Sequence, residues 1–312
     1  NNLAIKGAAR FHRERRPKVV TLASEHKCVL ESARDLEREG HAVAILPVRP
    51  DGLVDLDLLA GTVDEQTSIV SVMSVNNEIG VIQPVKEIAA LCREKGAYFH
   101  CDAAQAVGKI PLDVADLGVD LLSISGHKFY GPKGIGALYV RRRPRVRLEP
   151  LMSGGGQERG LRSGTLPTPL CVGLGAAAEI AGNEMAAESE RISALRLRLL
   201  EGIKGRLSGV ALNGHAERRV AGNLNLSFEG VDAEALMRAL PSLAVSSGSA
   251  CTSTAVEPSY VLRALGLPEA RARSSIRLAI GRFNSEAEID TAIEELATQV
   301  ERLRREGSAA AE

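Results

Sequence analysis

Residues 19–140 alternate between short apolar runs and longer helical runs, and this alternation restricts the possible folds more than any other feature of the chain. Helices are predicted over Glu25–Glu39, after an N-cap at Ser24, and over Val85–Lys95, between Pro84 and Gly96. The predicted strands are Val19–Leu22, His41–Val48, Thr67–Ser74, Ala97–Cys101, Asp120–Ser125 and Gly136–Val140. Such alternation predicts an α/β domain whose mostly parallel sheet is covered by helices on both faces.

The second half of the chain has a different pattern. A long amphipathic helix is predicted over Glu184–Leu207. A last helix starts at the capping box formed by Ser285 and Glu288 and is predicted to end near Arg305. We therefore predict two domains, a large α/β domain over residues 1–185 and a smaller α+β domain over residues 186–312.

Composition argues against several classes of protein. Lys and Arg total 39, as do Asp and Glu, so the net charge is zero and binding of nucleic acid through bulk charge is not expected. The sequence contains no run of about 18 apolar residues, so no membrane span is predicted. The five cysteines form no Cys-x-x-Cys pair, which argues against a metal site or a disulfide scaffold and indicates a reducing, cytoplasmic location.

Lys128 and Asp102 carry the strongest chemical signal. Each follows a predicted strand, and open α/β sheets bind ligands where their strands end. A lysine and a carboxylate in that place are the pair that pyridoxal phosphate needs, because the amine holds the aldehyde and the carboxylate keeps the ring nitrogen protonated. Taken alone, Lys128 is typical of a solvated loop, and Asp102 of an N-cap for the turn that follows.

Other features are consistent with such a site, although each has a plainer interpretation. Cys251 lies in the Ser/Gly-rich run 246–254, which predicts a mobile, exposed loop. A thiol in such a loop can act as a nucleophile if its pKa is lowered from about 8.5. The plainer interpretation is a surface cysteine without a chemical role. His26 can stack on a flat ring or be a polar helix-start residue. Arg277 is a solvent-facing charge or a clamp for a carboxylate. The Gly-rich run 153–165 can cradle phosphate or merely turn the chain.

Seven motifs are spread over nearly the whole chain. Because of these motifs the chain resembles the cysteine desulfurases of the Isc/Nif type, which are pyridoxal-phosphate enzymes of the class-V aminotransferase group. The motifs are Ser24–Lys27, Val75–Gly80, His100–Gln105, Ser125–Lys128, Arg162–Thr165, Ser247–Ser253 and Ser274–Arg277. The Ser247–Ser253 motif resembles the group with the longer cysteine loop. The resemblance implies a large domain of fold type I with a mostly parallel mixed sheet, a smaller α+β C-terminal domain and a homodimer.

The resemblance also implies a role for each site residue. Cys251 would attack the sulfur of L-cysteine, leaving alanine and an enzyme persulfide. Lys128 would hold pyridoxal 5'-phosphate as a Schiff base, and His26 would stack on its ring and assist proton transfer. Asp102 would pair with the ring nitrogen and Gln105 with the phenolic oxygen. The remaining implied contacts are Ser125 and His127 to the phosphate, Thr165 to the phosphate from the partner subunit, Asn77 to the cofactor, and Asn77 and Arg277 to the substrate carboxylate.

The sulfur would then pass to a scaffold for iron–sulfur clusters or to a tRNA-thiolation relay, without direct contact to nucleic acid or membrane. Chains of this family begin some tens of residues earlier, with a Gly-Ala-Thr phosphate loop, and have a longer C-terminal tail; we therefore expect these 312 residues alone to bind the cofactor weakly. Two alternatives stay open. A related pyridoxal enzyme, such as a selenocysteine lyase or an aminotransferase acting on small amino acids, would not need Cys251. In a non-catalytic partner or an inert fragment, borohydride would not trap the cofactor on Lys128.

Overall fold

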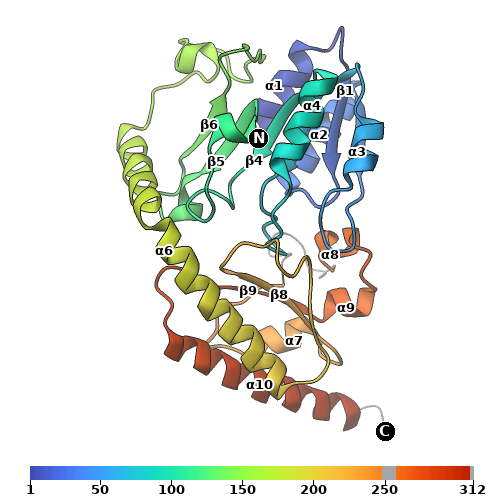
Figure 1. Ribbon diagram of the computed structural model, residues 1–312, viewed down its shortest axis with the longest axis vertical. Helices are drawn as coiled ribbons and strands as arrows, with labels where there is room; N and C mark the ends of the chain where they lie inside the picture. The colour runs from blue at the N-terminus through green and yellow to red at the C-terminus, as the bar shows by residue number, and fades with distance from the viewer. Residues whose placement is uncertain (248–257, 310–312) are drawn as a thin grey trace. The chain divides into compact units, whose positions relative to one another are not determined.

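The computed structural model describes residues 1–247 and 258–309, which form two compact units (Figure 1). Unit 1 consists of Asn1–Arg49, Leu53–Asn76 and Ile82–Met185. Unit 2 consists of Pro50–Gly52, Asn77–Val81 and the described residues of Ala186–Glu312. Two short segments from the first half of the sequence therefore fold as part of unit 2.

Unit 1 contains a six-stranded sheet with the strand order β2-β1-β3-β4-β5-β6. The strands are β1 (Lys18–Leu22), β2 (Ala42–Leu46), β3 (Thr67–Met73), β4 (Tyr98–Asp102), β5 (Leu121–Ser125) and β6 (Gly136–Val140). Neighbouring strands are parallel except β6, which runs antiparallel to β5. All seven residues of β3 are buried, as expected for a central strand covered on both faces. The mostly parallel sheet confirms the predicted fold class.

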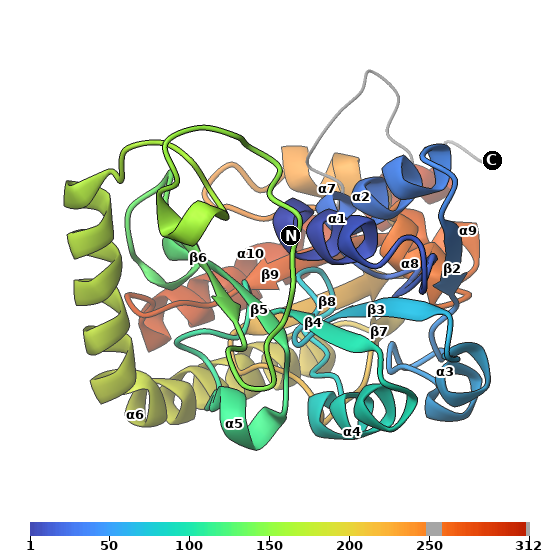
Figure 2. The same ribbon diagram turned by 90° about the horizontal axis from the view of Figure 1, so that it is seen from above.

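Helices cover both faces of this sheet. On one face lie α1 (Asn2–Phe11) and α2 (Lys27–Arg38), and on the other α3 (Leu56–Thr62), α4 (Val85–Lys95) and α5 (Val114–Leu117) (Figure 2). Helix α4 has the predicted bounds and ends at Gly96, whose φ of 69° is left-handed. No helix was predicted at α1. Its buried residues, which are mostly Ala and Gly, lie at helical spacing on one face, and a Cβ at Gly7 would lie 2.7 Å from the Glu149 carbonyl oxygen.

Three predicted helix boundaries are wrong. Ser24 is not the N-cap of α2; the cap is His26, and the Ser24 carbonyl instead accepts a hydrogen bond from the Asn76 amide at 2.9 Å. Helix α6 spans Thr168–Arg206 and so begins before Glu184. Its glycines have low helix propensity, but Gly173 packs so closely on Pro132 that a Cβ would lie 2.6 Å from the proline ring.

Helix α10 spans Glu286–Ala309 and so runs past the predicted end near Arg305. Its predicted capping box is confirmed. The Ser285 N–H donates to the Glu288 carboxylate at 2.9 Å, and the Glu288 N–H donates to the Ser285 hydroxyl at 3.3 Å. Beyond Arg305 the chain continues helically because the backbone bonds of an existing helix propagate more easily than a new turn forms.

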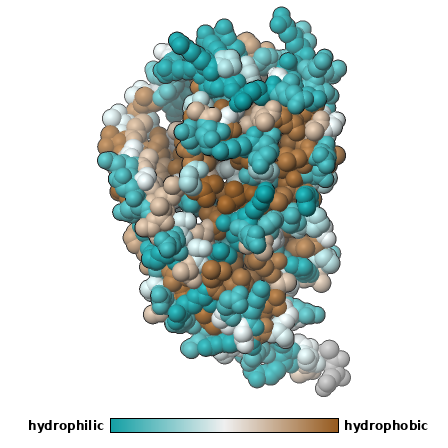
Figure 3. Space-filling model, viewed as in Figure 1, coloured by the Kyte–Doolittle hydropathy of each residue, from teal (hydrophilic) through white to brown (hydrophobic). Residues whose placement is uncertain are grey.

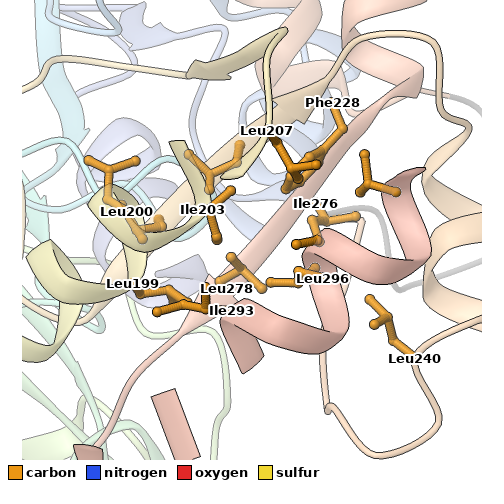
Figure 4. Packing of buried hydrophobic residues seen from close by; sticks show 14 of the residues in the cluster. Leu199, Leu200, Ile203, Leu207, Phe228, Leu240, Ile276, Leu278, Ile293 and Leu296 are labelled. Atoms are coloured by element: carbon orange, nitrogen blue, oxygen red, sulfur yellow. The ribbon is translucent and has the colours of Figure 1, made fainter. Parts of the chain in front are cut away.

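Unit 2 is built on an antiparallel sheet with the order β7-β8-β9, made of β7 (Val210–Leu212), β8 (Asn223–Phe228) and β9 (Ser275–Ala279). Its short helices are α7 (Ala233–Arg238), α8 (Tyr260–Ala264) and α9 (Glu269–Arg273). Leucines and isoleucines of α6 and α10 pack on one face of the sheet, against side chains such as Phe228 and Ile276 (Figure 4). Because side chains alternate along a strand, the other face of β8 carries Asn223, Asn225 and Ser227.

The surface seen in Figure 3 mixes hydrophilic side chains with apolar patches. Exposed large apolar side chains include Val172 and Phe283. No helix in the described part of the chain is long and apolar enough to cross a membrane. Within the same residues, no group of three or more His, Cys, Asp or Glu side chains is arranged to hold a metal ion.

Candidate active site

Asp102 and Lys128 come from two adjacent strands of unit 1. Asp102 is the last residue of β4 and pairs with Ser123 of the parallel strand β5. Two residues later β5 ends, and the 3-10 helix η1 (Gly126–Phe129), which contains Lys128, follows at once. Since β4 and β5 run in the same direction, Asp102 and η1 lie at the same edge of the sheet. That carboxyl edge is where open α/β sheets bind ligands.

Within η1, Phe129 packs into the core, whereas the two polar side chains point to solvent. Lys128 and His127 are exposed, and no described residue forms a hydrogen bond or ion pair with the Lys128 amine. The Ser125 hydroxyl lies 3.3 Å from Nδ1 of His127. The end of β5 therefore presents an amine that has no partner among the described residues, and the same turn carries a hydroxyl and an imidazole.

Asp102, by contrast, is 6% exposed and its carboxylate is held on both sides. Oδ1 accepts the Ala104 N–H at 2.9 Å, so the side chain caps the turn after β4 as the plainer interpretation expected. Oδ2 accepts the Asn1 amide at 2.7 Å. In the same turn Gln105 accepts the Lys109 amine at 2.7 Å through Oε1, which leaves its NH2 group as a donor.

His26 follows β1 and joins this edge through a chain of contacts. As the N-cap of α2 it accepts the Cys28 N–H at Nδ1 (3.2 Å), and the Cys28 Sγ lies 3.0 Å from the same nitrogen. The Asn1 Nδ2 donates both to this Sγ at 2.9 Å and to Asp102. Side chains after β1 and β4 are thereby connected through Cys28 and Asn1.

Neither Cys28 nor Asn1 was singled out as a candidate site residue from the sequence. Cys28 is half-buried, and burial raises the pKa of its thiol above the ordinary value, opposed by the hydrogen bond from Asn1. Its contact with His26 was missed because the sequence placed the cap of α2 at Ser24 and not at His26.

Two buried titratable groups lie beneath these residues and were also not singled out. Glu25 is fully buried, and both of its carboxylate oxygens accept the Met73 N–H, at 2.9 and 3.0 Å. Burial raises its pKa well above the ordinary value, and the nearby negative charge of Asp102 raises it further.

His100 is the second of these groups. Its Nδ1 lies 2.8 Å from the Ser71 hydroxyl of β3 and its Nε2 lies 2.8 Å from the Ser123 hydroxyl of β5. Burial lowers its pKa to about 3, so the ring is neutral near pH 7. His100 lies two residues before Asp102 and on the same face of β4, and it cross-links the three strands below the carboxyl edge.

Asn77 and Arg277 are brought together within unit 2. Arg277, on β9, is half-buried and donates from Nη1 to the Asn77 carbonyl oxygen at 2.9 Å. It is thus neither a purely solvent-facing charge nor, in this contact, a carboxylate clamp. The Asn77 side chain is half-buried too, and its Oδ1 has no hydrogen-bond partner among the described residues.

The segment after Asn77 is anchored to the polar face of the small sheet. Asn223 and Asn225 both donate to the Glu78 carbonyl oxygen at 3.3 Å. Gly80 has a left-handed φ of 71°, and a Cβ there would lie 2.6 Å from the Asn223 side-chain oxygen. Only glycine fits this turn, so the Asn-Asn-Glu-Ile-Gly motif has a structural requirement as well as a candidate binding residue.

The structure shows no hydrogen bond from Thr165 to another predicted site residue among the described residues. Thr165 is exposed and follows a loop that bonds to itself, since the Gly164 N–H donates to Gln157 at 3.0 Å and the loop contains the 3-10 helix η2 (Glu158–Gly160). Cys251 lies outside the described residues.

Comparisons with known proteins agree with the motifs. The model of the class-V aminotransferases matches residues 1–291. Cysteine desulfurase IscS of Rickettsia bellii is 57% identical over 304 residues, covering 97% of this chain and 74% of that protein. Of the solved structures, a NifS-like protein matches with a TM-score of 0.87 and 35% identity over 95% of this chain and 78% of its own.

A further solved structure, SspA in complex with cysteine, matches with a TM-score of 0.78 and 38% identity, covering 91% of this chain and 79% of the other. The family model, the sequence relative and the structural matches agree with one another and with the carboxyl-edge arrangement of unit 1. The chain therefore belongs to the class-V aminotransferase family and, within it, to the cysteine desulfurases.

Proposed function

We propose that this protein removes sulfur from L-cysteine, releasing L-alanine and leaving a persulfide on Cys251, with pyridoxal phosphate as cofactor. The observation that carries the proposal is the pairing of Asp102 with Ser123, because it sends the carboxylate and the lysine-bearing turn η1 to the same edge of the sheet. The similarity to a protein solved in complex with cysteine supports the choice of substrate.

The residues at this edge fit the cofactor by their chemistry. When bound, pyridoxal phosphate supplies an aldehyde that joins amines and a protonated ring that withdraws electrons. Asp102 has one described donor on each oxygen, so lone pairs remain to accept a ring N–H. The unpaired Lys128 amine would hold the aldehyde, and the Gln105 NH2 group would donate to the phenolic oxygen.

The cofactor's phosphate needs donors. The Ser125 hydroxyl and the His127 ring, 3.3 Å apart, are suited to bind it together. We place Thr165 of the partner subunit of a homodimer on the same phosphate, as the family resemblance implies. His26 would cover the ring of the cofactor, and Asn77 would contact it as well as the substrate.

Asn77 and Arg277 would hold the substrate carboxylate. Arg277 uses one N–H of its five for the Asn77 carbonyl, which leaves the rest of its planar fork for a carboxylate. The same bond holds Asn77 beside it. Both side chains are half-buried, which strengthens charge-assisted hydrogen bonds relative to those in bulk water.

The sulfur transfer balances without an external oxidant. The C–S bond of the substrate breaks, and an S–S bond forms to the Cys251 sulfur. The two thiols together give alanine and a Cys251 persulfide, so one hydrogen ends on the alanine methyl group and one on the terminal sulfur. Lys128 would move these protons, and His26 would assist the transfer. The persulfide sulfur would then pass to a scaffold protein for iron–sulfur clusters or to a tRNA-thiolation relay in the cytoplasm.

The test compares purified wild-type protein with Cys251→Ser and with Cys171→Ser, a cysteine of α6, as the matched control. We expect Cys251→Ser to retain cofactor absorbance but to lose alanine production from cysteine, while Cys171→Ser retains both. Unchanged alanine production by Cys251→Ser would remove Cys251 from the mechanism. Absence of a borohydride-trapped cofactor on Lys128 would reject the cofactor assignment.

A further inference from the structure

The first turn of α2 constrains the ring of His26. His26 is the N-cap of this 12-residue helix, and its Nδ1 accepts the Cys28 N–H at 3.2 Å. An imidazole nitrogen accepts a hydrogen bond only when it carries no proton of its own. This contact therefore favours the neutral ring that has its proton on Nε2.

The Cys28 side chain acts in the same direction. Its Sγ lies 3.0 Å from the same Nδ1, and the sulfur itself accepts the Asn1 amide at 2.9 Å. Because burial raises the pKa of the thiol, Cys28 keeps its hydrogen near pH 7, and the S–H is a second donor toward Nδ1. The backbone and the side chain of one residue thus both donate to one nitrogen.

The other nitrogen of the ring has no such partner. His26 is exposed, and no described residue forms a hydrogen bond with its Nε2. The two nitrogens therefore differ in their hydrogen bonding: Nδ1 accepts from the first turn of α2, and Nε2 is exposed to a ligand.

We propose that Cys28 is a positioning residue that holds His26 in the Nε2–H tautomer, so that His26 presents an N–H donor at Nε2 to a bound ligand. The assignment of cofactor or substrate as that ligand rests on the proposed function, whereas the tautomer itself does not. A proton on Nδ1 would remove the acceptor that caps α2, so the cap and the Nε2–H donor are maintained together.

The test is the tautomer itself, measured by long-range ¹H–¹⁵N correlation on protein labelled with [¹⁵N]histidine, at a pH where the ring is neutral. The His26 signals are identified by their loss in His26→Gln. We expect an unprotonated Nδ1 and a protonated Nε2 in the wild type. A protonated Nδ1 would overturn the proposal.

Variants separate the two donors. Cys28→Pro removes both the N–H and the thiol at a first-turn position that tolerates proline, and we expect its spectrum to show a mixture of tautomers. Lys27→Pro is the matched control, because it places proline at the first helical position and keeps Cys28 intact; it should retain the wild-type pattern. An unchanged pattern in Cys28→Pro would overturn the role of Cys28.

Cys28→Ala removes the thiol alone, and we expect the Nε2–H tautomer to remain the major form with a measurably smaller share. Should Cys28→Pro fail to fold, an unchanged share in Cys28→Ala would still exclude the thiol. Alanine production is measured on the same samples. Active protein with a protonated Nδ1 overturns the tautomer alone, and inactive protein with the expected tautomer overturns the proposed function alone.

Discussion

The two units hold their candidate residues in opposite ways. Unit 1 presents His26, His127 and Lys128 exposed beyond the ends of its strands, whereas unit 2 keeps Asn77 and Arg277 half-buried and bonded to each other. A group that forms a covalent bond or moves a proton must be reached by its substrate. A group that recognises a carboxylate works better when its position is set in advance. Among the described candidate residues, the exposed groups of unit 1 are therefore suited to chemical steps and the bonded pair of unit 2 to orientation.

The largest effect should come from the exposed amine. Lys128→Ala removes the group proposed to hold the cofactor and move protons, and we expect alanine production to fall about 10³-fold or more. The matched control is Lys133→Ala, another exposed lysine shortly after η1, which should retain wild-type activity. Equal losses in both variants would mean that the loop, and not the Lys128 amine, is needed.

Arg277→Lys tests orientation in unit 2. It keeps the charge but loses the planar fork and the bond to the Asn77 carbonyl, so kcat/KM for cysteine should fall about 10- to 100-fold, mainly through a higher KM. Arg273→Ala, an exposed arginine paired with Glu269, is the control. If kcat fell while KM stayed constant, Arg277 would belong with the chemical groups and the contrast between the units would fail.

Gly80→Ala tests whether the turn after Asn77 is as rigid as its packing indicates. The left-handed φ and the nearby Asn223 both oppose a Cβ, so the free energy of unfolding should drop by about 1–3 kcal/mol. Denaturant unfolding measures this. Gly61→Ala is the control, because nothing lies within 4 Å of its added Cβ and alanine favours the helix. Equal stabilities in the two variants would contradict the account of this turn.

His100 sharpens the comparison, because its hydrogen bonds to Ser71 and Ser123 connect three strands directly below the exposed edge of unit 1. Its pKa is about 3 in the folded protein against 6.5 ordinarily, so between these values the unfolded chain binds one more proton. Protonation of His100 in the unfolded chain should therefore lower the free energy of unfolding by about 1.4 kcal/mol per pH unit as the pH falls from 6.5 to 3. His100→Asn should remove this share of the slope in denaturant titrations. An identical slope in the variant would show that the ring is protonated in the folded state.

Local signals predicted the six strands of the unit 1 sheet to within two residues at each end and one helix with its observed bounds. Strand β6 and helix α4 have the predicted bounds, since apolar runs, Pro84 and Gly96 act within a few residues. The start of α6 and the whole of α1 were not predicted. Both contain glycines and other small residues whose close packing only the tertiary structure shows, as for Gly7 on Glu149. The predicted cap at Ser24 failed because a histidine took that role.

The candidate site shows the same division. Asp102 and Lys128 were recognisable because polar residues after apolar runs mark strand ends. The cross-link made by His100 and the bonds from Asn1 to Cys28 and Asp102 were not, because each joins segments that are far apart in the sequence. The roles of the site residues, Cys251 included, stay predictions.

The sequence alone determined where the strands end, which chemical groups follow them and which family the motifs resemble, because these are properties of short stretches of chain. The tertiary structure decided that β4 lies beside β5, that residues 77–81 belong to unit 2, and that Arg277 meets a carbonyl 200 residues away. Strand order and hydrogen-bond partners arise from the folding of distant segments onto one another, and no local pattern encodes which segments will meet.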